Sequence, residues 1–97
     1  MDLSPFFNIE CTYVLELTDN KYYVGKTKDI KNRIENHFTT GGSSFTKIYK
    51  PLKIVLIRHQ NQEKELTIEY MKKYGWQNVR GYSWSQVNLK NKPKCLT

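Results

Sequence analysis

The stretch of residues 12–37 constrains the fold most, because its side-chain pattern changes once along its length. Two short runs rich in β-branched and aromatic residues, 10–17 and 21–25, flank a connector that carries Asp19 and Asn20. Asp and Asn tolerate left-handed backbone and bond it locally, so they suit a tight turn between antiparallel strands. The pattern therefore predicts a β-hairpin.

A helix is predicted directly after the hairpin, over residues 27–38. Ile30, Ile34 and Phe38 recur every four positions, which places them on one face of a helix. Arg33 and His37 are also four apart and lie beside that apolar face. A tyrosine from each strand, an arginine and a histidine can therefore converge, in a combination suited to phosphate chemistry.

The rest of the chain predicts one small α+β domain. A loop over 39–44 leads to a short helix ending near Tyr49, then to a strand over 52–59 and a third helix that ends before Gly75. Residues 10–90 form the predicted domain, 91–97 a basic tail and 1–9 a lead-in. The lead-in is either flexible or covers one edge of the core with Phe6 and Phe7.

Charge and composition favour a nucleic-acid partner inside the cell. The formal net charge is +7, and residues 1–20 contain four acids and no bases, so the basic excess begins with the second strand. Basic surfaces bind polyanions through counterion release. Two cysteines are too few for a zinc cluster, and the longest apolar run, 54–57, is too short to cross a bilayer. These features predict a reduced protein of the cytoplasm or nucleus without a membrane segment.

The motifs resemble the GIY-YIG nuclease family. The resemblance rests on Tyr13-Val14, Tyr23-Val24-Gly25 and Arg33 at its spacing, with the first triplet departing from the family pattern at Thr12. Further matches are Lys26, His37, Lys50-Pro51, Ile68-Glu69-Tyr70 and 78–81. The resemblance implies a small three-stranded antiparallel sheet flanked by helices. It also implies an endonuclease that hydrolyses phosphodiester bonds, here with DNA as the expected substrate.

The resemblance assigns the catalytic roles to Tyr13, Tyr23, Arg33, His37 and Glu69. Glu69 is implied as the sole protein ligand of one Mg²⁺ or Mn²⁺ ion; its ordinary alternative is a solvated helix residue paired with Lys72 or Lys73. Arg33 would clamp phosphate rather than pair with Asp29. Either Tyr13 or His37 takes the proton of the attacking water, and a phenol in that role needs nearby positive charge to lower its pKa.

Four further residues are predicted to contact substrate: Gly25, Lys26, Gly42 and Arg80. Lys26 follows Gly25 at the start of the first helix, where anions are favoured. Gly42 lies in a loop that the resemblance places near the substrate. Arg80 is the fourth, although Ser83 or Asn88 could equally support the site. Three aromatic residues near Arg80 either stack on bases or pack in the core: Trp76, Tyr82 and Trp84.

Two rival functions remain compatible with the residues. The first is a degenerate domain that binds nucleic acid without cutting it, and the second is a protein-interaction domain. The predicted domain uses nearly the whole sequence. Sequence specificity is therefore expected from substrate shape, from a homodimer or from a targeting partner protein.

Overall fold

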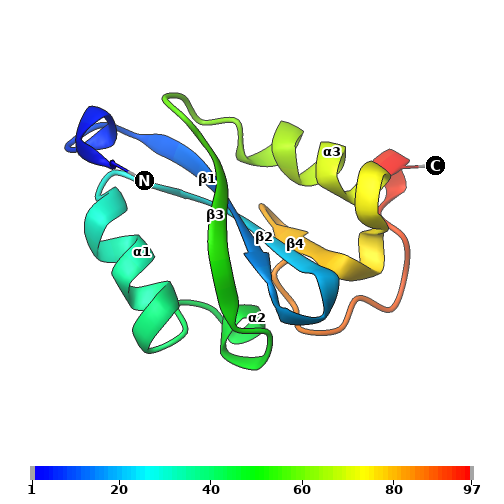
Figure 1. Cartoon of the computed structure of the whole chain (residues 1–97). Helices are drawn as coiled ribbons and strands as arrows, with labels where there is room; N and C mark the ends of the chain where they lie inside the picture. The colour runs from blue at the N-terminus through cyan, green and yellow to red at the C-terminus, as the bar shows by residue number, and fades with distance from the viewer. Residues whose placement is uncertain (1, 97) are drawn as a thin grey trace.

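In the computed structural model, which describes residues 2–96, a mixed four-stranded sheet of order β3-β1-β2-β4 is covered by helices (Figure 1). The strands are β1 (Cys11–Leu17), β2 (Lys21–Thr27), β3 (Pro51–Arg58) and β4 (Val79–Gly81). The helices are α1 (Ile30–Thr39), α2 (Ser44–Ile48) and α3 (Glu63–Tyr74). Single helical turns cover Ser4–Phe6, Thr18–Asn20, Trp76–Asn78 and Lys94–Leu96. No helix among the described residues is long and apolar enough to span a membrane.

The predicted hairpin is confirmed. Strands β1 and β2 pair antiparallel with Tyr13 opposite Gly25, and the connecting turn holds Asp19 and Asn20 at φ 59° and 58°. Those left-handed values are the ones that Asp and Asn accept at small cost. The hairpin is the centre of the sheet, because β3 adds antiparallel to β1 on its other side.

The expectation of three antiparallel strands is wrong in one respect, because β4 adds a fourth strand parallel to β2. Tyr22, Tyr23 and Val24 pair with the three residues of β4. A run of Val-Arg-Gly has neither the length nor the alternation that identifies a strand in a sequence. Only the pairing with β2 makes it one.

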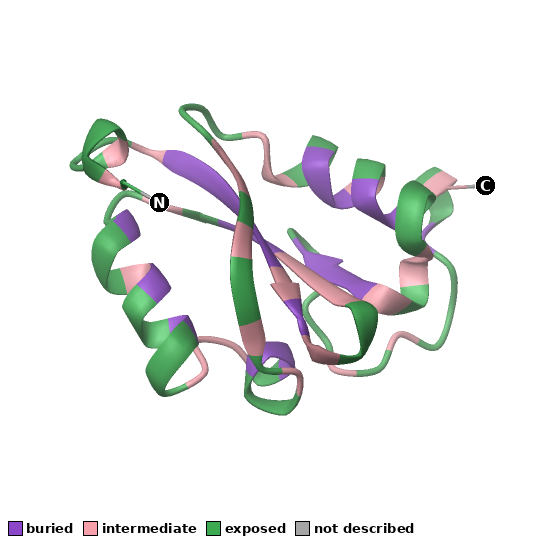
Figure 2. Cartoon of the chain, viewed as in Figure 1, coloured by how far each residue is buried: buried purple, intermediate pink, exposed green. Residues whose placement is uncertain are grey.

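The two faces of the sheet carry two separate cores. Tyr13 and Leu15 of β1 point to the face covered by α1 and α2, whereas Val14 points to the face covered by α3 (Figures 1 and 2). The first core consists of Cys11, Tyr13, Leu15, Leu17, Ile30, Ile34 and Phe45. The second consists of Val14, Val24, Leu66, Tyr70, Met71 and Val79. Since β1 is central, its alternation sorts neighbouring side chains to opposite faces.

Local sequence signals set the helix ends within a few residues. The Asp29 carboxylate accepts a hydrogen bond from the backbone N–H of Asn32, so α1 starts at Ile30 rather than at residue 27. Phe38, expected on the apolar face of the first helix, is 44% exposed, and Tyr74 of α3 is 37% exposed. Both lie in the last turns of their helices, where Tyr74 still stacks on the Tyr22 ring of β2 at 4.2 Å.

Both chain ends pack on the domain. Phe6 is half-buried against the first core, whereas Phe7 stays exposed. In the segment expected to be a basic tail, Pro93 is buried and Leu96 packs against the second core.

Candidate functional site

A buried hydrogen-bonded cluster forms where β1 meets α1. The Tyr13 phenol oxygen lies 2.7 Å from Nε2 of His37, and Nε of Arg33 donates to the same oxygen at 3.3 Å. The ring of Tyr23 lies 5.1 Å from the His37 ring, centroid to centroid. The structure thus brings together four of the five predicted catalytic residues.

The bond from Arg33 has a fixed direction, and the two bonds to His37 follow from the imidazole tautomer. The Nε–H of Arg33 can only donate, so the Tyr13 oxygen accepts from it. The phenol can donate its own proton to Nε2 of His37 in the imidazole tautomer that has its lone pair on Nε2. The remaining proton of the neutral imidazole sits on Nδ1 and points to Oγ1 of Thr46, 3.1 Å away. A single proton path therefore runs from Tyr13 to His37.

Thr46 was missed by the sequence reasoning. It is buried, and its hydroxyl also bonds Ser43, whose side chain caps α2 in a capping box. The capping pattern of Ser43 and Thr46 is visible in the sequence. Its proximity to His37 depends on how α2 folds back against α1.

Burial sets the protonation states of Tyr13 and His37. Desolvation raises the pKa of the Tyr13 phenol and nearby Tyr23 adds to the rise, while the hydrogen bond and charge of Arg33 oppose it. The charge of Arg33 lowers this pKa as expected, but desolvation outweighs it, so the net shift in the protein alone is upward. Desolvation, assisted by the charge of Arg33, lowers the pKa of His37 to about 4. At neutral pH the phenol is protonated and the imidazole is neutral.

Gly25 and Gly42 serve close packing around this cluster. A Cβ on Gly25 would lie 2.4 Å from the Tyr13 phenol oxygen, and one on Gly42 would lie 3.1 Å from the His37 ring. The tyrosine can reach His37 across β2 only because residue 25 has no side chain. The structure thus explains both glycines by packing, where the sequence suggested substrate contacts.

The carboxylate whose charge acts on Tyr13 belongs to Glu63 rather than Glu69. Desolvation raises the pKa of Glu63, and Lys26 and a hydrogen bond from the backbone N–H of Tyr82 oppose this rise. The charge of Glu63 also acts on Tyr13. Glu63 therefore joins Lys26 and Tyr13 at one end of the sheet.

Glu69 is exposed, outside the buried face of α3, and its charge acts on the adjacent Tyr70, so its role as metal ligand stays a prediction. Glu63 and Glu69 are six positions apart on α3, which directs their side chains about 120° apart. Leu66, Thr67, Tyr70 and Met71 define the buried face, and Glu63 continues that face one turn earlier. That shared spacing is the signal that could have identified Glu63 in the sequence.

Thr12 holds the segment that leads into α3. Its buried hydroxyl donates to the Gln60 carbonyl at 2.7 Å and accepts from the Gln62 N–H at 2.8 Å. Glu63 is the next residue. The position at which the first motif departs from the family pattern is thus the one that ties β1 to the start of α3.

Arg80 is a structural residue, which corrects its predicted contact with substrate. It is 3% exposed, and its guanidinium donates to the carbonyls of Trp76, Gln77, Val79, Gln86 and Val87. It also stacks over the Phe45 ring at 4.9 Å. Because these acceptors use the whole guanidinium fork, Arg80 organises the chain around β4. Ser83 and Asn88, the alternatives, are exposed.

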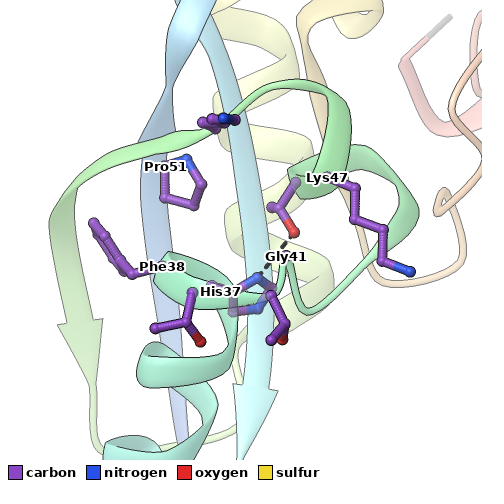
Figure 3. Close-up of a pocket in the computed structure, with 9 residues that line it drawn as sticks. His37, Phe38, Gly41, Lys47 and Pro51 are labelled. Carbon is purple, nitrogen blue, oxygen red and sulfur yellow. Dashed lines mark hydrogen bonds between the residues drawn. The ribbon is translucent and has the colours of Figure 1, made fainter.

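A basic pocket lies behind the histidine, between the end of α1 and the start of β3. His37, Phe38, Gly41, Lys47 and Pro51 line it, together with Thr39, Thr40, Thr46 and Lys50 (Figure 3). The dashed line in Figure 3 is the bond from His37 to Thr46. His37 therefore separates this pocket from Tyr13.

The described residues contain no cluster of three or more His, Cys, Asp or Glu side chains able to hold a metal. Glu63 offers a single half-buried carboxylate beside Lys26 and near Tyr13. One carboxylate fits Mg²⁺ or Mn²⁺, hard ions that retain most of their water ligands and gain others from substrate phosphate. It does not fit a structural zinc site.

A family model and several relatives match the part of the chain that holds the cluster. The GIY-YIG catalytic domain model matches residues 9–79. A UPF0213 protein of Bacillus cereus (strain ATCC 10987 / NRS 248) is 33% identical over 64 residues, covering 65% of this chain and 67% of the relative. A UPF0213 protein of Pediococcus pentosaceus is 33% identical over 67 residues, covering 68% and 70%. A UPF0213 protein of Streptococcus agalactiae is 36% identical over 53 residues. The match covers 55% of this chain and 60% of that relative. No solved structure matches.

Proposed function

Because this chain belongs to the GIY-YIG catalytic domain family, we propose that it is a divalent-metal-dependent endonuclease that hydrolyses phosphodiester bonds in DNA. The observation that carries the proposal is the line of hydrogen bonds from Arg33 through Tyr13 to His37, with Glu63 near the same phenol. A structural core has little need of such a line, since apolar packing costs less desolvation.

Arg33 binds the scissile phosphate. Its guanidinium is half-buried, and its Nε is already fixed by the Tyr13 oxygen. The remaining N–H groups can hold phosphate oxygens and stabilise the negative charge that builds in the transition state. Lys26, exposed at the end of β2, adds a second positive charge.

Tyr13 orients the attacking water and relays its proton. The phenol cannot serve as a free phenolate, because burial raises its pKa. It can accept a proton from water while its own proton passes to Nε2 of His37 over 2.7 Å. His37 is then the final acceptor, and Thr46 keeps its ring in the tautomer that can receive the proton. Tyr23 packs against the imidazole and limits the access of bulk water.

Glu63 would hold one Mg²⁺ or Mn²⁺ ion. When bound, such an ion polarises the phosphate and lowers the pKa of coordinated water. The carboxylate supplies the protein's single ligand, and the backbone N–H of Tyr82 keeps it oriented. The remaining specificity comes from substrate shape, from a homodimer or from a targeting partner.

Cleavage of plasmid DNA with Mg²⁺ or Mn²⁺ tests the proposal. We expect Glu63→Gln to lower the rate at least about hundredfold, since a metal supplies several kcal/mol of transition-state stabilisation. Glu69→Gln, on the exposed face of the same helix, is the matched control and should stay within about twofold of wild type. Equal loss in both variants would contradict the assignment of Glu63. Absence of cleavage on linear, nicked and branched DNA would overturn the nuclease itself.

A further inference from the structure

The turn that follows β4 places an exposed aromatic ring beside the candidate metal ligand. Tyr82 is 45% exposed, and its backbone N–H bonds the Glu63 carboxylate. Its ring lies 5.6 Å from the ring of half-buried Trp84, which supports it from the protein side. The phenol ring is therefore held by Trp84 and partly open to solvent beside Glu63.

The backbone at Tyr82 is one that a tyrosine adopts at a cost. Gly81 and Trp84 exchange two hydrogen bonds of 2.9 Å, so Tyr82 and Ser83 form a two-residue turn. Tyr82 has φ 52°, whereas Ser83 is not among the positive-φ residues, a pattern that favours glycine at the first position. Core packing does not account for a strained residue that is nearly half exposed.

A positive charge accompanies the ring. Nζ of Lys64 lies 5.9 Å from the centre of the Tyr82 ring, and Lys64 directly follows Glu63 at the start of α3. An exposed aromatic face beside an ammonium group can hold one nucleotide, with its base on the ring and its phosphate on the lysine. Duplex DNA hides its base faces, so such a site needs an unpaired base.

We propose that Tyr82 and Lys64 form a binding site for an unpaired nucleobase next to the scissile phosphate. This inference rests on the proposed nuclease function and narrows its substrate to nucleic acid with a single-stranded or flipped nucleotide beside the cut. Trp84 holds the ring in place. The hydrogen bond from Tyr82 to Glu63 ties the bound base to the metal ligand.

Binding measured in EDTA separates this inference from catalysis. The probes are a short fluorescein-labelled single-stranded DNA, its duplex, and a single strand of abasic nucleotides, followed by anisotropy. We expect Tyr82→Asn to bind the single strand about five- to hundredfold more weakly, which is the effect of losing one stacked base. Tyr82→Asn should bind the duplex and the abasic strand with wild-type affinity. Tyr82→Phe keeps the aromatic ring and should bind the single strand with wild-type affinity.

Two comparisons guard against an indirect effect. Asn accepts left-handed backbone, so Tyr82→Asn should melt at the wild-type temperature or above it. The control is Tyr74→Asn, because Tyr74 is exposed by 37%, has Lys73 over its ring at 5.2 Å, and lies at the opposite end of α3. It should leave single-strand binding unchanged.

Three results would overturn the inference. They are unchanged single-strand binding by Tyr82→Asn, an equal loss on all three probes, or an equal loss in Tyr74→Asn. If wild-type protein shows base-dependent binding but never cleaves, the base-binding site is supported and the nuclease function is contradicted. If the protein cleaves DNA but shows no base-dependent binding, the nuclease function is supported and the base-binding site is contradicted.

Discussion

The phenol oxygen of Tyr13 and Nε2 of His37 are 2.7 Å apart, in a pair that is almost wholly closed to solvent. The pair joins the central strand to the end of α1. It also places Nε2 of His37 as the ring nitrogen that faces the phenol, while Nδ1 faces Thr46.

The buried His37 predicts a pH-dependent stability. Its folded pKa of about 4 lies below the ordinary 6.5, so the unfolded chain binds the extra proton between these values. The free energy of unfolding should therefore fall as pH drops from 6.5 to 4, by roughly 3 kcal/mol in total. Urea unfolding of wild type and His37→Gln across this range measures the difference. Glu63 acts in the opposite direction in both proteins, so their difference isolates His37.

Gly25→Ala should disrupt the cluster and the fold together. The new Cβ would lie 2.4 Å from the Tyr13 phenol oxygen, so the buried ring or the strand must shift. We expect a loss of about 1–3 kcal/mol in unfolding free energy and a large loss of cleavage, because Tyr13 must leave His37. Lys26→Ala, at the exposed neighbouring position, should keep the stability of wild type. Equal stability of Gly25→Ala and wild type would show that the packing is looser than described.

Arg33→Lys should separate charge from geometry. Lysine keeps the positive charge but loses the Nε bond to Tyr13 and the planar fork. We expect cleavage to fall about a hundredfold or more, while the melting temperature stays close to that of wild type. A lysine variant with full activity would mean that a point charge is sufficient at this position.

Arg80→Lys should show the opposite behaviour. Five backbone carbonyls that now accept from the guanidinium would lose most of their bonds. We expect a loss of about 2–4 kcal/mol in unfolding free energy, with unchanged DNA affinity per folded molecule. Arg58→Lys, on exposed β3, is the control and should be neutral. Weaker DNA binding by a fully folded Arg80→Lys would restore the substrate role.

Thr12→Val should weaken catalysis through the position of Glu63. Valine matches threonine in shape but leaves the Gln62 N–H without its partner, at a cost of about 1–3 kcal/mol. Thr12→Ser keeps the hydroxyl and should keep both stability and kcat. If Thr12→Val lowers stability but leaves kcat and KM untouched, Thr12 supports the fold without positioning Glu63.

Particular residues show where sequence reasoning succeeded. Tyr13, Tyr23, Arg33 and His37 meet as expected, because a hairpin followed by a helix is short-range geometry that periodicity records. Asp19 and Asn20 adopt the predicted left-handed turn. The motif Tyr23-Val24-Gly25 indicated the right family for the same local reason.

Other residues depended on contacts between distant segments. Glu63 and Glu69 look alike in the sequence, and the packing of α3 on β2 and β4 decided which of them faces Tyr13. Arg80 resembles a phosphate ligand until the carbonyls of residues 76–87 surround it. Thr46 has no mark of function until α2 folds against His37.

The sequence by itself determined the elements, the hairpin turn and the cluster along β1, β2 and α1, because neighbours in the chain share one backbone geometry. The tertiary structure decided the fourth strand, the carboxylate whose charge acts on Tyr13 and the burial of Tyr13 and His37. Those features are set by which side chains lose their water when distant segments pack. That loss of water shifts a proton or orients a carboxylate in ways that no local pattern records.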